Sequence, residues 1–482
     1  MKARQQIFGL IFLVILTISM ASCTPAPAPT TAATQPPAEQ PAAPAETEAP
    51  VAPPTEPPAA PPTEPPAVEP VTLVFWWWGE EEAPGLESWI QTVVPAFEAA
   101  NPGIKIETVR QTVDGLVPAA QAAMAAKQGP DIQYYWPVTW MQEDIWAGNL
   151  AALDDLIPEE VAHYIPAFKN HVSYKGKTYG MPLYNIGNPW VYNKEIFAEV
   201  GLDPENPPAT WDEFLAAGEK IKAAGYTPIA AGMRDQWYAD WPWMLLQICT
   251  LESNEEWYNT YLGIDGTKLS DPKYVETWTK WKELIDKSFF PNDVMSLDLY
   301  VGFDLFLQGK AAIASPVQPL MVQWSKQMGA EKLGVMLTPC WQETGLSKKF
   351  PTASQYLSIT SYSKHQQEAA LFLKFLHEPE QMKSLYEMAG AMTADDRWDP
   401  AWLASGIDQQ MYQWTKDIPS VTLYYIAPPV IDEWIWPAAG QLYTNTSTPE
   451  AIGELGEQII AAWREANPEL VANFIEWSKF NK

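Results

Sequence analysis

Apolar and polar residues alternate in blocks from residue 71 onward. An apolar run of strand length, 71–79, comes first and ends at a glycine. The periodicity then predicts an amphipathic helix over 86–100, a strand over 104–111, a second helix over 115–127 and a third strand over 131–135. Strands that alternate with helices favour a parallel sheet whose crossover connections are right-handed.

The stretch 181–192 has a different pattern, because it is rich in β-branched and aromatic residues and is interrupted by proline. Thr210 and Glu213 then stand at the spacing of a capping box, which predicts a helix over 210–224. We therefore interpret this extended stretch, which lies between two folded halves, as a segment that crosses from one lobe to the other.

The second half of the chain continues this mixture of helices and strands. Prolines at first helical turns and glycines after last turns mark several boundaries. The pattern predicts helices over 271–287, 297–308, 364–377 and 379–389, helices that begin at Pro449 and Pro468, strands over 311–315 and 350–360, a second crossing segment over 333–339 and a third near Met392.

The first 23 residues have the pattern of a secretory signal peptide. Lys2 and Arg4 precede the apolar run 7–18, which is too short for a comfortable membrane span. Small residues directly before Cys23 resemble a bacterial lipobox, so we expect this cysteine to be lipidated and to become the mature N-terminus. Ordinary signal cleavage beside an incidental cysteine is the alternative.

Residues 24–70 form a low-complexity run of Pro, Ala, Thr and Glu without aromatic residues. Such a segment cannot bury a core and is expected to be disordered and partly polyproline II. At about 3.1 Å per residue it would reach on the order of 100 Å. We therefore interpret it as a tether between the membrane and the folded part of the chain.

Composition narrows the class of ligand. The 482 residues are 47% hydrophobic, enough for two domains, and the formal net charge of −29 argues against a nucleic-acid partner. The chain has 24 Trp and 20 Tyr. Many of these rings will pack in cores, but flat apolar faces with polar edges also suit sugar rings, whose hydroxyl groups seek hydrogen bonds.

The cysteines and histidines show no metal-binding or redox spacing, so we expect no metal and no cofactor. Nucleophile-elbow, P-loop, HExxH and dinucleotide motifs are also missing from the sequence. Cys249 and Cys340 could form a disulfide in an oxidising compartment, or each could fill a small apolar site. The sequence leaves these two possibilities open.

Several stretches carry a family resemblance that runs in order from residue 71 to the end. They read AFEAANPGIKIE, AAMAAKQGPDIQYYW, YGMPLYNIGNPWVYNKEIFAEVGLDPENPPATWDEF and FLQGKAAIAS. Together they resemble the extracellular solute-binding proteins of ABC importers, of the carbohydrate-binding type that includes maltose-binding protein. The resemblance implies an α/β, two-lobed periplasmic-binding-protein-like fold, in which each lobe is a mostly parallel sheet flanked by helices and several crossing segments form the hinge.

This resemblance and the patterns above give an expected division of the chain. It comprises a lipoprotein signal peptide (1–23), a disordered linker (24–70), an N-terminal lobe (71–184 with 336–392) and a C-terminal lobe (185–335 with 393–482).

Candidate ligand contacts are aromatic and polar residues at the carboxyl ends of the predicted strands, where open α/β sheets bind ligands. Others stand where the resemblance places stacking aromatics and sugar-hydroxyl contacts. The expected ligand-binding residues are Trp76, Trp77, Trp78, Glu80, Gln111, Tyr135, Trp136, Asn188, Trp190, Trp237, Tyr238, Asp240, Trp241, Gln318, Trp324, Gln355 and Trp434.

We therefore expect a monomeric, non-enzymatic receptor that is lipid-anchored to the outer face of the bacterial cell membrane. It would close its lobes on a mono- or oligosaccharide and deliver it to ABC importer permease subunits. One alternative is a tethered glycoside hydrolase or lyase, with its carboxylate pair drawn from Glu80, Asp240 and Glu433. The other is a receptor for a non-sugar solute, such as a peptide or an iron complex.

Overall fold

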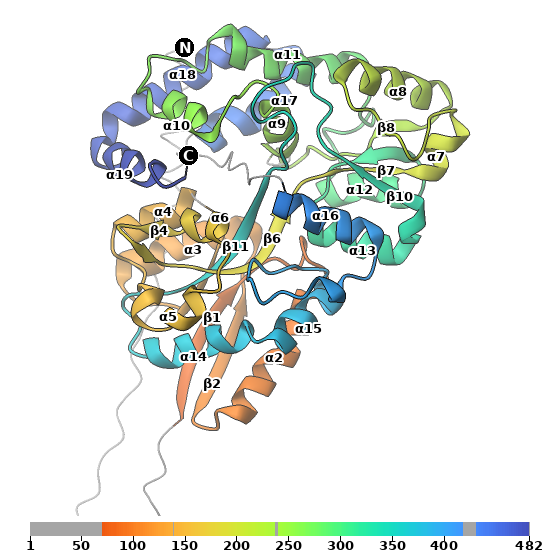
Figure 1. Ribbon diagram of the computed structural model, residues 1–482. Coiled ribbons are helices and arrows are strands. Elements are labelled where there is room, and N and C mark those ends of the chain that lie inside the picture. Colours follow the sequence, from red (N-terminus) through yellow and green to blue (C-terminus); the bar gives the residue numbers. More distant parts are fainter. Residues whose placement is uncertain (1–69, 138, 237–239, 418–429, 482) are drawn as a thin grey trace, which may run out of the picture. The chain divides into compact units, whose positions relative to one another are not determined.

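A computed structural model describes residues 70–137, 139–236, 240–417 and 430–481 (Figure 1). The expectations for the signal peptide, for lipidation of Cys23 and for the linker lie outside these residues. Within them, every helix is too short or too polar to cross a membrane.

A five-stranded sheet is built mainly from the first third of the chain. Its strands, in spatial order, are β2 (Ile104–Arg110), β1 (Val71–Trp77), β3 (Ile132–Tyr135), β11 (Thr352–Ile359) and β6 (Met181–Gly187). β1 is parallel to both of its neighbours, whereas β11 is antiparallel to both of its own. The parallel pairing predicted from the early strand–helix alternation is therefore present, with one reversed strand inserted late in the sequence.

Helices bury both faces of this sheet. The helices beside it are α2 (Leu86–Ala100), α3 (Val113–Ala126), α4 (Thr139–Trp146), α14 (Gln366–Leu376) and α15 (Pro379–Ala389). The Phe372 ring of α14 lies 6.0 Å from Phe75 of β1 and 5.0 Å from Phe97 of α2. Tyr135 and Tyr356 belong to a second cluster with residues of α3 and α4. Successive strand residues thus enter different cores, as expected for a sheet covered on both faces.

A second sheet has the order β10 (Leu333–Met336), β7 (Trp190–Asn193), β9 (Ala311–Ala314) and β8 (Thr227–Ile229). β8 and β9 are parallel, whereas β7 is antiparallel to β9 and to β10. Around it lie α8 (Trp211–Ala223), α11 (Pro272–Asp286), α12 (Leu299–Leu307) and α13 (Gln318–Met328). Each sheet therefore contains one strand that runs against the others.

Capping residues explain where these helices begin. The capping box of Thr210 and Glu213 is present at the start of α8, as predicted. α3 begins two residues earlier than predicted, because the Thr112 side chain accepts a hydrogen bond from Gly115 N at 3.1 Å. α12 begins later than predicted, because Asp298 accepts from Tyr300 N at 2.9 Å and so serves as its N-cap.

Three segments connect the two sheets. β6 leads into β7 through Asn188, and β10 leads into β11 (Figure 1). The third segment follows α15 and contains Met392, whose carbonyl accepts a hydrogen bond from Asn185 N at 2.7 Å. Gly187 at the end of β6 has no side chain because the Phe350 ring occupies that space, only 2.4 Å from where a Cβ would lie. The crossing segments expected from the sequence are therefore packed against one another.

The remaining helices are α5 (Pro158–Val161), α6 (Pro166–His171), α7 (Lys194–Glu199), α9 (Asp240–Gln247), α10 (Asn254–Leu262), α16 (Gly406–Asp417), α17 (Trp436–Tyr443), α18 (Pro449–Ala466) and α19 (Pro468–Ser478). Short 3₁₀ turns lie at Leu153–Asp155, Ala330–Lys332 and Pro400–Trp402, a π-helical turn lies at Val430–Ile435, and the strands β4 (Ser173–Tyr174) and β5 (Lys177–Thr178) form a hairpin. α18 packs on α11, and α19 packs on α10.

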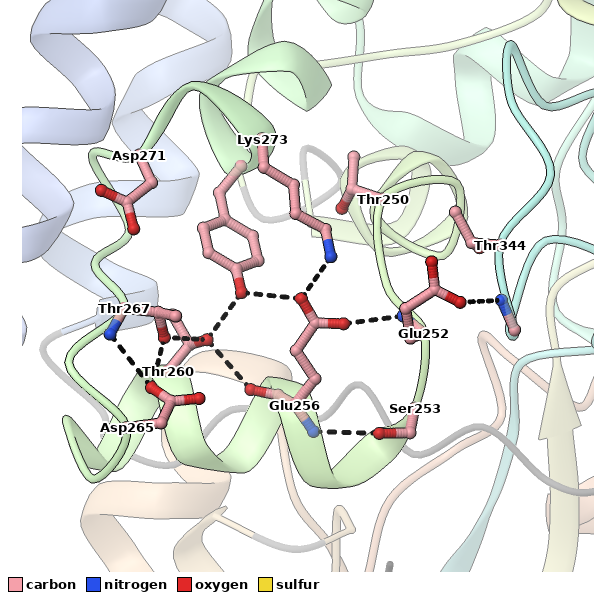
Figure 2. Close-up of polar contacts among 12 residues, drawn as sticks. Thr250, Glu252, Ser253, Glu256, Thr260, Asp265, Thr267, Asp271, Lys273 and Thr344 are labelled. Atoms are coloured by element: carbon pink, nitrogen blue, oxygen red, sulfur yellow. Dashed lines mark hydrogen bonds and ion pairs between the residues drawn. The ribbon is translucent and has the colours of Figure 1, made fainter.

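A polar cluster and a disulfide secure the region around α10. Figure 2 shows the Glu256 carboxylate between Lys273 and the backbone of Glu252. It accepts from Glu252 N at 2.7 Å and from the Tyr274 hydroxyl at 3.0 Å, and it pairs with Lys273 of α11. Glu252 in turn accepts from Gly345 N at 2.8 Å. The nearby Cys249–Cys340 disulfide, with a Cα–Cα distance of 5.2 Å, settles the question that the sequence left open.

Candidate functional site

A pocket with about 430 Å³ of empty space lies at the carboxyl end of β3. Its lining comes from α3 (Leu116, Val117, Ala120, Gln121), from β3 and the residue after it (Gln133, Tyr134, Tyr135, Trp136) and from α4 (Glu143, Asp144). The Asp131 carboxylate accepts from Val74 N at 2.8 Å and so fixes the start of β3 beside β1. The pocket therefore lies where open α/β sheets bind ligands.

Aromatic rings gather where β1 and β3 end. Trp78 directly follows β1 and is buried, and its ring meets Trp136 edge-on at 5.4 Å between centroids. Trp78 also meets Tyr134, at 6.1 Å between centroids. Trp136 is only partly buried and lines the pocket. Because Trp136 packs against the buried Trp78 ring, its own ring is a preorganised apolar surface.

A buried polar network supports these rings. The Glu82 carboxylate accepts from Gln355 Nε2 of β11 at 2.7 Å and from the Tyr184 hydroxyl of β6 at 3.3 Å. The Tyr184 hydroxyl also lies 3.0 Å from that of Tyr134. Burial raises the pKa of both Tyr134 and Tyr184 well above the usual value, so both stay neutral phenols. The network ties the β1–α2 connection to three other strands of the sheet.

Two successive carboxylates of α4 face the pocket. Asp144 accepts from the Tyr135 hydroxyl and from Asn149 Nδ2, both at 2.7 Å. Burial raises the pKa of Asp144 despite these hydrogen bonds. Burial, reinforced by the charge of Asp144, also raises the pKa of Glu143. The pocket is thus rich in hydrogen-bond acceptors, and the described residues that line it include neither lysine nor arginine.

The other predicted residues of the first sheet lie on β1 or beside it. Trp76 is partly buried on β1, whereas Trp77 is buried with the Arg110 guanidinium 5.7 Å from its ring centroid. Gln111 follows β2 and is partly buried. The Glu80 carboxylate accepts from two backbone N–H groups at the start of α2, at 2.8 and 2.6 Å. Those hydrogen bonds give Glu80 a structural role at a helix N-terminus.

The predicted residues in or beside the crossing segments, Asn188, Trp190 and Gln318, are buried. The Asn188 Nδ2 and Gln318 Oε1 atoms have no hydrogen-bond partner among the described residues. Gln318 Nε2 donates to Gly390 O at 3.4 Å. Trp190 of β7 lies 5.4 Å from the Phe214 ring. Asn185, Gly187, Gln318, Phe350, Thr352, Met392, Met411 and Thr415 line a smaller hollow of about 210 Å³ beside these segments.

Three predicted tryptophans are buried among the helices around the second sheet. Trp324 of α13 stacks on Phe306 at 5.2 Å. Trp434 donates from Nε1 to Ile452 O at 2.8 Å and lies 5.7 Å from the Trp243 ring. Trp241 of α9 is also buried, with 9% of its surface exposed. Trp237 and Tyr238 lie outside the described residues, as does the side chain of Asp240, the first residue of α9.

Potential metal ligands come together once among the described residues. His163, Asp395 and Asp396 place ligand atoms within 4.8 Å of one another. The Asp395 carboxylate, however, already accepts from Arg397 and pairs with His377. The Asp395 oxygens are therefore already engaged in protein contacts. Ion pairing accounts for the clustering of His163, Asp395 and Asp396.

Five polar residues were missed as site candidates by the sequence analysis: Glu82, Gln121, Gln133, Glu143 and Asp144. Glu143 and Asp144 come soon after the strand that ends at Tyr135, so their place after a strand end was an available signal. Gln133 was read only as part of a strand. Its role depends on the strand face that it occupies, which a four-residue strand does not reveal.

The chain resembles known binding proteins along most of its length. A family model described as "Bacterial extracellular solute-binding protein" matches residues 83–383. A putative binding protein of Brucella abortus (strain 2308) is 28% identical over 301 residues, which cover 60% of this chain and 68% of that protein. The sn-glycerol-3-phosphate-binding periplasmic protein of Rhizobium meliloti (strain 1021) is 25% identical over 321 residues, which cover 62% of this chain and 67% of that protein.

The fold also has close structural counterparts. A solved structure described as a chitin oligosaccharide binding protein superimposes with a TM-score of 0.71 at 22% identity, covering 82% of this chain and 99% of that chain. At 22% identity, this structural similarity is evidence for the fold alone. It confirms the two-lobed α/β architecture with helix-flanked sheets that the sequence predicted.

Proposed function

This chain belongs to the bacterial extracellular solute-binding proteins, and from that premise we propose that it captures a mono- or oligosaccharide and delivers it to an ABC importer. One observation carries the choice of ligand, namely the pocket at the end of β3. There the Tyr135 and Trp136 rings adjoin amide and carboxylate acceptors. Rings that stack on sugar faces, beside acceptors for hydroxyl groups, suit a carbohydrate.

Electrostatics favours a sugar over a phosphate ester. The Rhizobium relative is described as binding sn-glycerol-3-phosphate, and the structural counterpart as binding chitin oligosaccharide. A phosphate group would need basic side chains or backbone N–H groups around it. The part of the pocket that the structure describes instead presents Glu143 and Asp144 and no basic residue. These carboxylates would repel an anion, so the acid-lined pocket supports an uncharged or cationic ligand.

The proposed mechanism is closure of two lobes about the three crossing segments. We keep the lobe boundaries predicted above, 71–184 with 336–392 and 185–335 with 393–482. Ligand contacts that can be made from both lobes only in the closed form would stabilise that form. The closed receptor would then dock on the importer, and no chemical step is required of it.

We further propose that lipidation of Cys23 anchors a monomeric receptor to the outer face of the cell membrane. The small residues before Cys23 and the tether-like composition of 24–70 support this anchor. Replacing Cys23 with Ser should release the protein into the medium of cells that otherwise retain it in the membrane fraction. Equal retention of both forms would contradict the anchor.

Calorimetric titration with a panel of neutral and aminated mono- and oligosaccharides, together with glycerol 3-phosphate, tests the ligand class. We expect saturable binding of at least one sugar and none of the phosphate ester. The Trp136→Ala variant should weaken sugar binding by about 1–3 kcal/mol, because a stacking ring is lost. Trp402→Ala is the matched control, since Trp402 is also partly buried and does not line the pocket.

Two results would contradict the proposal. One is the absence of binding by every sugar of the panel while glycerol 3-phosphate binds. The other is a time-dependent increase of reducing ends when purified protein is incubated with an oligosaccharide, which would indicate a hydrolase. If Trp136→Ala and Trp402→Ala reduce the affinity equally, the pocket at the end of β3 does not contact the sugar.

A further inference from the structure

The pocket at the end of β3 holds more negative charge than its surroundings compensate. Asp144 has two hydrogen-bond donors, Tyr135 and Asn149, and its charge is partly offset by Lys127. Lys127 lies outside the pocket lining and donates to Asn149 Oδ1. The Glu143 carboxylate forms no hydrogen bond or ion pair with the described residues, although the residue is partly buried. Its carboxylate is the uncompensated group of the pocket.

A second acceptor in the pocket is unsatisfied. Gln133 has none of its surface exposed, and its Nε2 donates to Tyr134 O at 2.7 Å. Its Oε1 has no hydrogen-bond partner among the described residues, although Gln133 lines the pocket. A buried acceptor without a donor is unfavourable and is usually satisfied by water or by a ligand. The pocket therefore presents two acceptors, the Gln133 amide oxygen and the Glu143 carboxylate, to a ligand group with several N–H or O–H donors.

The rings of the pocket add a third preference. Tyr135 and Trp136 both line it, and Trp136 is held edge-on by Trp78. Aromatic faces attract cations as well as apolar sugar faces. A neutral hydroxyl group could donate to Gln133 Oε1, but it would leave the charge of Glu143 unbalanced. A protonated amine satisfies the amide oxygen, the carboxylate and the aromatic face together.

We propose that this pocket binds the protonated amino group of an aminated sugar, with Glu143 as its ion-pair partner, Gln133 Oε1 as a hydrogen-bond acceptor and Trp136 as the stacking surface. The inference rests on the proposed function and narrows its ligand class from sugars in general to sugars that carry a free amine. It assigns specificity to residues that the family resemblance did not single out.

Matched ligands test the inference. Each amino disaccharide of glucosamine type is titrated at pH 7 beside its N-acetylated and its hydroxyl counterpart of the same linkage. We expect the free amine to bind roughly tenfold more tightly than either counterpart, and Glu143→Gln to abolish most of that preference. Glu107→Gln is the control, because Glu107 is exposed on β2 and this change alters the net charge equally.

The outcomes separate the inference from the proposed function. Equal affinity for amine and hydroxyl members, or an amine preference that survives Glu143→Gln, would overturn the inference and leave sugar binding intact. Absence of binding by every member of every matched set would overturn the inference, whereas the proposed function falls only if the wider sugar panel described above also fails to bind. Loss of the preference in Glu107→Gln would show that net charge, rather than the pocket, produces it, and would also overturn the inference.

Discussion

The Nδ1 atom of His377 lies 3.0 Å from Oδ2 of Asp395, and both side chains are almost completely buried. On the other side of the ring, Nε2 lies 2.8 Å from the carbonyl oxygen of Pro182 in β6. Asp395 follows Met392 in the third crossing segment, and Pro182 belongs to β6, which leads into the first crossing segment. The His377 imidazole therefore links these two segments. Arg397 completes the cluster, donating to Asp395 and to Glu160 of α5. The crossing segments are therefore held together by buried charge as well as by packing.

We predict that Asp395→Asn destabilises the protein by about 3 kcal/mol, because it removes the buried carboxylate that both Arg397 and His377 contact and leaves Arg397 with Glu160 alone. Burial alone would raise the pKa of Asp395, but hydrogen bonds from Arg397 and His377 outweigh burial and hold that pKa far below its usual range. The lowered pKa means that Asp395 stabilises the fold above about pH 4 and that this stability is lost at lower pH. Urea unfolding of both proteins at pH 7 and pH 3 measures the difference.

Asp396→Asn is the control for this prediction. Asp396 pairs with His163 at 2.7 Å, but both side chains are substantially exposed, at 62% and 41%. Exposed ion pairs contribute little, so we expect a loss below about 1 kcal/mol. Equal destabilisation by the two substitutions would refute the role assigned to Asp395.

A second prediction concerns His171, the last residue of α6. Burial lowers the pKa of His171 to about 4. Its backbone carbonyl accepts from Trp477 Nε1 of α19 at 3.1 Å. Because the unfolded chain binds a proton near pH 6.5 and the folded chain does not, stability should fall as pH decreases from about 6.5 to about 4.

The shift corresponds to on the order of 3 kcal/mol over that interval. His171→Gln should remove this part of the pH dependence, whereas His365→Gln, at a partly buried position before α14, should retain it. Thermal unfolding between pH 7 and pH 4 measures the slope. The same slope in wild type and His171→Gln would contradict the prediction.

Local sequence signals predicted most of the fold. The capping box at Thr210, the prolines that open α11, α15, α18 and α19, and the glycine after α15 depend only on neighbouring residues. Their helices therefore begin or end within a few residues of the predicted positions. Two predicted helix starts were wrong by a few residues, because the N-cap side chains of Thr112 and Asp298 begin α3 earlier and α12 later than the hydrophobic pattern suggested.

The candidate site was less predictable, because burial is decided by tertiary packing. Trp136, chosen because it follows a strand end, lines the pocket, whereas Trp324, chosen from the family resemblance, is buried against Phe306. Glu143 has the pattern of a solvated helix residue. Only the return of α4 to the end of β3 places it in the pocket. Distant partners such as Cys249 and Cys340 were likewise left open by the sequence.

A third prediction concerns the disulfide between Cys249 and Cys340, which are 91 residues apart in the sequence. In the chain-entropy model a link across such a loop stabilises the fold by on the order of 4 kcal/mol, by restricting the unfolded chain. Dithiothreitol should therefore lower the urea midpoint of the wild-type protein. The double variant Cys249→Ala/Cys340→Ala should have the lower midpoint already and should not respond to reductant. A wild-type midpoint that reductant leaves unchanged would contradict this stabilising role.

The last prediction concerns the pH dependence of ligand binding. Because burial raises the pKa values of Glu143 and Asp144, both carboxylates take up protons at higher pH than exposed ones do. A sugar amine stays protonated as pH falls below 7, so its affinity should fall as acid neutralises these carboxylates. Tryptophan fluorescence titration at each pH should show this decline for the amino sugar and not for its hydroxyl counterpart.

In Glu143→Gln the amino sugar should bind weakly at pH 7 already and respond less to acid, since only Asp144 remains to titrate. An affinity for the amino sugar that rises or stays level throughout the acid titration of the folded protein would mean that these carboxylates do not hold the ligand.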